Sequence, residues 1–263
     1  MSRVQSDNWL GRHNTVYPRW SAFQSLLWCV VIVVTIIFAQ QFILGMYVGT
    51  YHPEYLQKFN NSYPVVNIGR LQRDFQYDGT FFSLTTIILF TVTIVMLLAI
   101  VKLKKKASYI DYFAIRLPDF ASIQFWAFVL FLVLFAANAY ALVIGKPVPP
   151  EFLKKLYISA DPTWLLFMSI IVLNPLFNEL LFRGFVLSGL ENSELTPVGA
   201  VIVTSFIWAL VHYQLDLYMV VITFALGIVF GFSRIYSRSI LLPIGLHMFM
   251  NSAALLVVIN SQS

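Results

Sequence analysis

Four ionisable side chains lie inside, or at the end of, long apolar segments of this chain. They are Glu179, Arg183, His212 and His247, and the amide of Asn251 follows His247 by four residues. Ionisable groups within membrane-spanning segments are costly, so they usually face a partner, a cavity or a substrate pathway. Glutamate and histidine can transfer protons or bind a metal ion. Their concentration in the C-terminal half predicts that the functional site lies there.

The spacing of these residues predicts two pairs, each on one face of a helix. Glu179 and Arg183 are four residues apart, and so are His247 and Asn251. In lipid each partner would otherwise be stranded, so pairing is close to obligatory. A purely structural explanation is open for each feature: a buried ion pair, an interfacial His212, and hydrogen bonds between helices from the last pair.

The elements that must position these residues are predicted from composition. Of the 263 residues, 59% are hydrophobic and 11% are charged, whereas soluble domains carry roughly a quarter charged residues. Such a chain cannot cover a soluble surface, so we expect an all-α, polytopic bundle of about seven transmembrane helices. The predicted spans are 22–47, 80–101, 121–144, 163–187, 197–214, 217–233 and 239–259. The single cysteine, Cys29, lies in the first span and is expected to be apolar filler.

Basic residues next to the spans predict the orientation in the membrane. These residues are Arg3, Arg12 and Arg19 before the first span and Lys104, Lys105 and Lys106 after the second. Because Lys and Arg concentrate in cytoplasmic loops, we expect a cytoplasmic N-terminus, with a bacterial inner membrane as the location. The net charge of +5 then reflects topology. We therefore expect membrane lipids, and no nucleic acid, as partners.

The same reasoning predicts three regions. Residues 1–20 form a cytoplasmic segment, and residues 21–150 form the N-terminal transmembrane helices with an extracytoplasmic loop at 48–79. Residues 151–263 form the membrane core that carries the site. The first apolar run is too long for the core of a cleavable signal peptide, so we expect it to remain as an anchor.

Three motifs in the C-terminal half carry a resemblance to a known family. They read NPLFNELLFRG at 174–184, SFIWALVH at 205–212 and HMFMN at 247–251. In this order they resemble the signature motifs of the CPBP (CAAX protease and bacteriocin-processing, or Abi) family, which includes the Ras-converting CAAX endopeptidases. The family pattern is Glu-Glu-x-x-x-Arg, then an aromatic residue four positions before a histidine, then His-x-x-x-Asn/Asp. The resemblance covers residues 163–259.

This resemblance implies a role for each matching residue. The matches are Glu179 for the second glutamate, Arg183 for the arginine, Trp208 for the aromatic residue, His212 for the first histidine, and His247 and Asn251 for the last motif. The implied activity is endoproteolysis inside the membrane, on a peptide or membrane-tethered protein. In it, one glutamate and the first histidine activate a water, and the last motif stabilises the developing oxyanion.

The family's first glutamate, its usual general base, is replaced here by Asn178. An amide cannot accept a proton at neutral pH, and a positioned base typically contributes about 10²–10⁴ in rate. Three hypotheses stay open. The protein is a natural pseudoprotease that binds a segment as a membrane scaffold, an endopeptidase that uses Glu179 or another group as its base, or a deliberately inactivated variant of an active enzyme.

Metal use and site geometry are open as well. His212, His247 and Glu179 would satisfy a three-ligand zinc site, and a metal-free glutamate mechanism is equally compatible with the residues. The predicted topology places Glu179 near the cytoplasmic side and His212 near the outer side. The site therefore requires a distortion of the helices, for which Pro175 and Pro197 are candidates. A small transporter with a proton relay is a third possibility, although the sequence shows no internal repeat.

Overall fold

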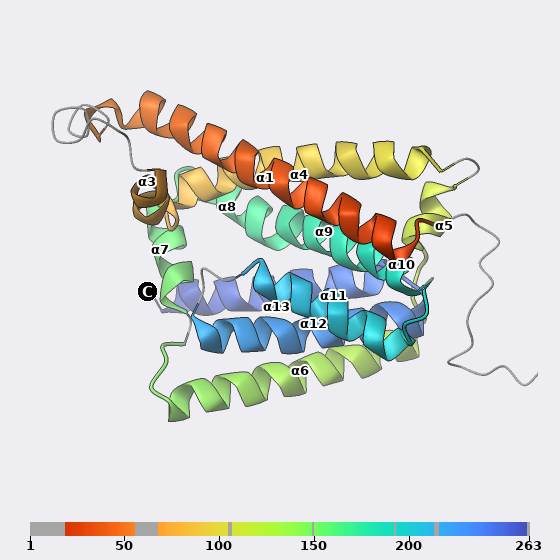
Figure 1. Cartoon of the computed structure of the whole chain (residues 1–263). Coiled ribbons are helices and arrows are strands. Elements are labelled where there is room, and N and C mark those ends of the chain that lie inside the picture. Colours follow the sequence, from red (N-terminus) through yellow and green to blue (C-terminus); the bar gives the residue numbers. More distant parts are fainter. Residues whose placement is uncertain are drawn as a thin grey trace, which may run out of the picture.

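The structure, a computed structural model, describes residues 19–55, 68–104, 107–148, 150–191, 193–212 and 216–261. Within these ranges the regular elements are helices, and no β-strand occurs. Six helical segments are long and apolar enough to cross a membrane, and a shorter apolar helix lies among them (Figure 1). The predicted all-α bundle of about seven spans is confirmed. Arg3, Arg12, Lys105 and Lys106, which supported the predicted orientation, lie outside the described residues.

The spanning elements follow the predicted segments closely. They are α1 (Ala22–Tyr51), α4 (Gly79–Lys102), α6 (Phe120–Val143), the composite segment from α8 to α10 (Thr163–Glu191), α11 (Pro197–Leu210), α12 (Leu217–Ser237) and α13 (Leu241–Asn260). Five of them begin at a polar residue whose side chain accepts a hydrogen bond from a backbone N–H in the first turn, which satisfies an otherwise free amide. These capping residues are Ser21, Asp78, Asp119, Thr196 and Asp216.

The composite segment departs from regular α-helix in two places. Its parts are α8 (Thr163–Phe167), the π-helix η1 (Met168–Leu173), α9 (Asn174–Glu179), the π-helix η2 (Leu180–Val186) and α10 (Leu187–Glu191). Pro175 lies in the first turn of α9, directly after η1. Wide π-helical turns change which side chains face a neighbouring helix, and they are frequent at functional sites. Here η1 precedes the first motif, and η2 contains its second half, including Arg183.

Helices α11 and α12 pack closely because small residues lie between them. A Cβ atom added at Gly227 would lie 2.8 Å from Ser205 Cβ, and one added at Gly231 would lie 2.7 Å from Val201 Cγ1. Small residues allow membrane helices to approach this closely. The glycines of α12 therefore hold α11 against the centre of the bundle.

The helices of both halves share one core. Figure 1 shows α1 and α6 on opposite sides of the bundle, with the composite segment, α11, α12 and α13 between them. One buried apolar cluster contains Cys29, Leu97, Phe182 and Trp208, from both halves of the chain. Three short helices lie at the two ends of the bundle: α5 (Tyr109–Phe113) where α1 begins, and α3 (Ile68–Phe75) and α7 (Glu151–Ser159) at the other end. The predicted loop 48–79 contains α3, and its residues 56–67 are not described.

Candidate functional site

A buried ionic group lies at the centre of the composite segment. Glu179, on α9, and Arg183, on η2, are both fully buried, and Arg183 Nε lies 3.3 Å from Glu179 Oε2. The other carboxylate oxygen, Oε1, lies 2.8 Å from Nδ1 of His247, which α13 supplies. Arg183 Nη2 also donates a hydrogen bond of 3.1 Å to the backbone carbonyl of Gly227 on α12. The composite segment, α12 and α13 therefore meet at this ion pair.

Asn178 lies beside this group and is held from two sides. Its Oδ1 accepts a hydrogen bond of 3.0 Å from the indole Nε1–H of Trp208 on α11. Its Nδ2 donates to the backbone carbonyl of Asn174 at 2.9 Å, and it also contacts the Asn174 side-chain oxygen. The amide therefore has partners for both its acceptor and its donor. Consecutive helix residues point about 100° apart, which explains why Asn178 faces Trp208 while Glu179 faces His247.

Three other motif residues, Arg183, His212 and His247, contact the indole ring of Trp208. The Arg183 guanidinium carbon lies 4.4 Å from the centre of the indole ring, which is a cation–π contact. The rings of His212 and His247 meet the indole edge-on, with centroids 5.3 Å and 5.7 Å away. Phe230 of α12 stacks on His247 at 5.0 Å. Both histidines thus lie around one aromatic ring.

Hydrogen-bond partners fix the tautomer of each histidine. His212 Nδ1 lies 2.8 Å from the backbone carbonyl of Trp208, which can only accept, so Nδ1 carries the proton. His247 Nδ1 faces the Glu179 carboxylate, which also pairs with Arg183, so the same nitrogen carries the proton there. In the neutral ring, each Nε2 is then left as a proton acceptor.

The structure brings most of the predicted residues together. Glu179 contacts His247, the histidine of the third motif, rather than His212, the histidine of the second motif. Asn251 lies one turn further along α13, where its Nδ2 donates a hydrogen bond of 2.7 Å to the carbonyl of Ile170. The contributions of Asn174 and of the Gly227 carbonyl were not foreseen. The spacing of four between Asn174 and Asn178 was a usable signal for the first, whereas nothing in the sequence points to a particular carbonyl.

The expected separation between Glu179 and His212 does not arise. Glu179 lies near the middle of the 29-residue composite segment, not near its cytoplasmic end as predicted. Helix α11 has only 14 residues, so it rises about 21 Å and ends part-way along its neighbours (Figure 1). Pro197 opens this short helix. Trp208, in the last turn of α11, and His212, two residues after its end, therefore lie at the depth of Glu179.

The donor set does not fit a metal ion in this arrangement. Within the described part of the chain, no three His, Cys, Asp or Glu side chains are grouped so that they could hold one. Both oxygens of Glu179 are already engaged, one by Arg183 and the other by His247. The zinc hypothesis stays a prediction, and no step below uses a metal.

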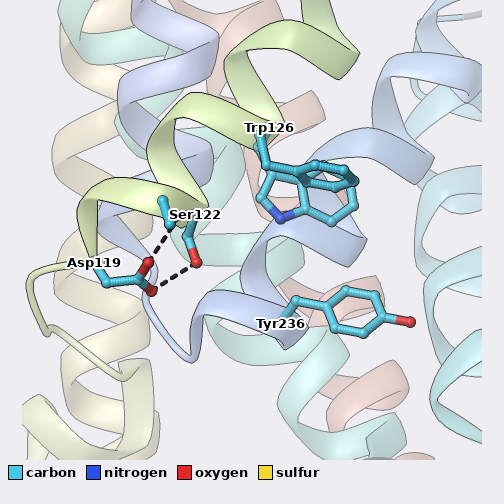
Figure 2. Close-up of a pocket in the computed structure, with 6 residues that line it drawn as sticks. Asp119, Ser122, Trp126 and Tyr236 are labelled. Carbon is cyan, nitrogen blue, oxygen red and sulfur yellow. Dashed lines mark hydrogen bonds between the residues drawn. The ribbon is translucent and has the colours of Figure 1, made fainter.

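A cavity of about 530 Å³ lies away from this cluster. It is formed between the start of α6 and the end of α12, where Asp119, Ser122, Trp126 and Tyr236 line it (Figure 2). None of its lining residues belongs to the three motifs. The cavity is therefore separate from the candidate site.

Comparison with protein families identifies the region that contains the cluster. Residues 160–253 match the family described as type II CAAX prenyl endopeptidase Rce1-like. A search of curated proteins and a search of solved structures found no match. The matched stretch begins just before the composite segment and includes all three motifs. The membrane core of this chain over residues 160–253 is therefore similar to the CAAX-protease (CPBP) family.

Proposed function

We propose that the protein is an intramembrane endopeptidase of the CAAX type, in which Glu179 and His247 together activate the attacking water. The family match supports the reaction class. The single observation that supports the residue assignment is the 2.8 Å contact between Glu179 Oε1 and His247 Nδ1. A carboxylate in this position orients an imidazole and stabilises the imidazolium that forms when the ring takes up a proton. Its other oxygen is neutralised by Arg183.

The proposed reaction needs one proton acceptor and one peptide bond. His247 Nε2 takes a proton from water while the water oxygen bonds to the carbonyl carbon of the substrate. The C–N bond then breaks as the imidazolium returns the proton to the leaving nitrogen. His212 presents a second Nε2 close to the same indole, where it can hold the water. Asn251 has a second amide hydrogen beyond the one given to Ile170, and we assign it to the oxyanion.

A non-catalytic binder is the second candidate, and the hydrogen bonds of Asn178 favour it. This residue stands where the family has its first glutamate, and its amide is satisfied by Trp208 and Asn174. Position 178 therefore provides no base. In this alternative the same group of residues binds a membrane-tethered segment without cutting it, as a scaffold does.

Cleavage of a membrane-peptide library by purified protein in liposomes tests the proposal. His247→Gln should lower the cleavage rate by about 10²-fold or more, because a positioned base contributes about 10²–10⁴. His52→Gln is the matched control, since His52 lies at the end of α1, outside the cluster. Cleavage by the unaltered chain that His247→Gln leaves intact would refute the assignment.

Asn178→Glu separates the two candidates. If the unaltered chain does not cut and Asn178→Glu does, the family chemistry is silenced in this chain and the binder is the better description. The Asn174 amide can turn so that its NH₂ group donates to the new carboxylate, so this change is compatible with the surroundings. If neither protein cuts any peptide, the endopeptidase proposal fails.

We further propose that the N-terminus is cytoplasmic and that the membrane is a bacterial inner membrane. Basic residues before α1, after α4, before α6 and at the end of α12 all belong to the end of the bundle that carries α5 and α10 (Figure 1). These residues are Arg19, Lys102, Lys104, Arg116, Arg234 and Arg238. The opposite end carries Arg70, Arg73, Lys146, Lys154 and Lys155. The described residues alone therefore show little asymmetry, and the proposed orientation depends mainly on the basic residues of the sequence before the first span and after the second. Lipids and a peptide or membrane-protein substrate, but no nucleic acid, are the proposed partners.

A further inference from the structure

Arg234, in the last turn of α12, is a buried cation, and two of its guanidinium nitrogens lack a hydrogen-bond partner among the described residues. The residue is only 4% exposed. Among the described residues, neither its Nε nor its Nη2 has a hydrogen-bond partner. Burying a charge without pairing it is costly, and an unsatisfied buried group of this kind often marks an ion or ligand.

The two unpaired nitrogens define the shape of the missing partner. Nε–H and Nη2–H lie along one edge of the guanidinium and point the same way, as a fork of two parallel donors. This fork matches two oxygens of a phosphate or carboxylate. A phosphate or carboxylate offers one oxygen to each of the two nitrogens of Arg234, whereas a single water or carbonyl oxygen would have to be shared between them.

The charges around Arg234 leave an excess of positive charge. The charged groups that act on it are Glu191, Arg19 and Arg116. Glu191 is already shared, because its Oε2 lies 3.7 Å from Arg19 Nη1. Arg116 pairs with Asp111 at 3.0 Å, so three cations face two carboxylates and one positive charge is left over. The side chains of Arg19 and Arg116 are 14% and 56% exposed, so the cations extend from the interior to the surface.

Further buried hydroxyls lie at the same end of the bundle. The hydroxyl of Ser188 on α10 has no hydrogen-bond partner among the described residues, whereas those of Ser25 on α1 and Tyr112 on α5 interact with each other. Arg19 also acts electrostatically on Tyr112, so these groups surround the same arginines. The region therefore combines hydroxyl groups that can donate to an anion with an excess of positive charge.

The depth of Arg234 is that of the lipid headgroups. Two residues further on, Tyr236 stacks on Trp126 at 6.0 Å, and both line the cavity at the start of α6 (Figure 2). Tryptophan and tyrosine concentrate at the membrane–water interface. The exposed carboxylate of Asp119 caps α6 at this level, and its hydrogen bonds to Ser122 lower its pKa, which keeps it charged. Basic pockets between helices at this depth are suited to anionic headgroups.

We propose that Arg234, together with Arg19, binds a phosphate group at this end of the bundle, either that of a phospholipid headgroup or a free phosphate. The fork of Arg234 holds two phosphate oxygens from inside, and Arg19 neutralises the remaining charge from the surface side. This site shares no residue with the three motifs, and it stands whether or not the protein cuts peptides.

Thermal unfolding of the full chain in neutral detergent tests the proposal. The probes are inorganic phosphate and micelles containing phosphatidylglycerol, and the reference is micelles containing diacylglycerol, which has no phosphate. Either phosphate-bearing probe should raise Tm by roughly 5–10 °C at a concentration near 100 times Kd. A response to phosphatidylglycerol alone identifies the lipid as the source. A response to inorganic phosphate alone identifies free phosphate.

Arginine variants show whether Arg234 is responsible for this rise in Tm. Arg234→Met, which removes the fork and the buried charge, should abolish the response. Arg238→Gln, at an exposed arginine four residues further on, should retain it. If Arg234→Met does not fold, Arg19→Gln takes its place and should weaken binding about tenfold, the effect of losing one charged contact of about 1.4 kcal/mol. The proposal is overturned if the unaltered chain responds to neither probe, if Arg238→Gln loses the response equally, or if the arginine variant that folds responds like the unaltered chain.

Discussion

Arg183→Met should destabilise the protein strongly, because it leaves the Glu179 carboxylate buried without its cation. The Nε–Oε2 distance of 3.3 Å corresponds to an attraction of about 5 kcal/mol at an effective dielectric constant of about 20. Removing one partner of a buried pair costs about 3–5 kcal/mol in measured cases. The Coulomb energy from this distance and the measured losses agree, so we expect the free energy of unfolding to fall by about 4 kcal/mol.

The opposite change should cost less, because Arg183 keeps other partners. After Glu179→Gln, the guanidinium still donates to the Gly227 carbonyl and still lies on the Trp208 ring. The double variant should therefore be more stable than the sum of the two single effects predicts, by about 2–3 kcal/mol, since neither charge is then left alone.

Thermal unfolding in detergent measures these effects. At this chain length, about 1 kcal/mol changes Tm by roughly 2–4 °C, so Arg183→Met should lower Tm by roughly 10 °C. Arg116→Met is the matched control, because Arg116 forms an exposed ion pair of 3.0 Å with Asp111 and such pairs contribute about 0.2–1 kcal/mol. Equal losses in the two arginine variants, or additive effects of the two site changes, would refute the reasoning.

Two further predictions concern contacts of α11. Gly227→Ala should destabilise by about 1–3 kcal/mol through crowding, since its Cβ would lie 2.8 Å from a neighbouring Cβ, whereas Gly45→Ala, with open space around it, should be neutral or stabilising in the same unfolding assay. Equal Tm values would contradict this. Trp208→Phe keeps the aromatic ring but removes the donor to Asn178, so we expect a loss of about 1–3 kcal/mol. A Trp208→Phe protein as stable as the unaltered chain would show that this hydrogen bond contributes nothing.

Sequence reasoning located the helices because the membrane sets their length and hydropathy. The span predicted at 121–144 is α6, Phe120–Val143, and the span predicted at 217–233 is α12, Leu217–Ser237. The span predicted at 197–214 is shorter than expected, because α11 ends four residues earlier, at Leu210. Hydropathy does not mark this helix end, because the end of a helix depends on local hydrogen bonds.

The candidate site was predictable as a set of residues but not as a set of contacts. Spacing within one helix predicted the Glu179–Arg183 pair, because i,i+4 geometry is local. Which histidine meets Glu179 depends on the depth of α11 and on the π-helical turns, and both are set by packing between helices. The unmet charge of Arg234 was hidden for the same reason, since a basic residue near a span end reads as a topology signal.

The shortness of α11 has a consequence for the bilayer itself. Its rise of about 21 Å falls short of a hydrocarbon thickness of about 30 Å. One side of α11 is exposed along its whole length, at Val198, Ile202, Phe206 and Leu210. Lipid chains therefore contact this short helix directly and must adapt to its length. A bilayer adapts to a short helix by thinning. The thinned patch would lie over the end of α11, and hydrolytic water and a tethered peptide would then reach His212 across less hydrocarbon than anywhere else around the bundle.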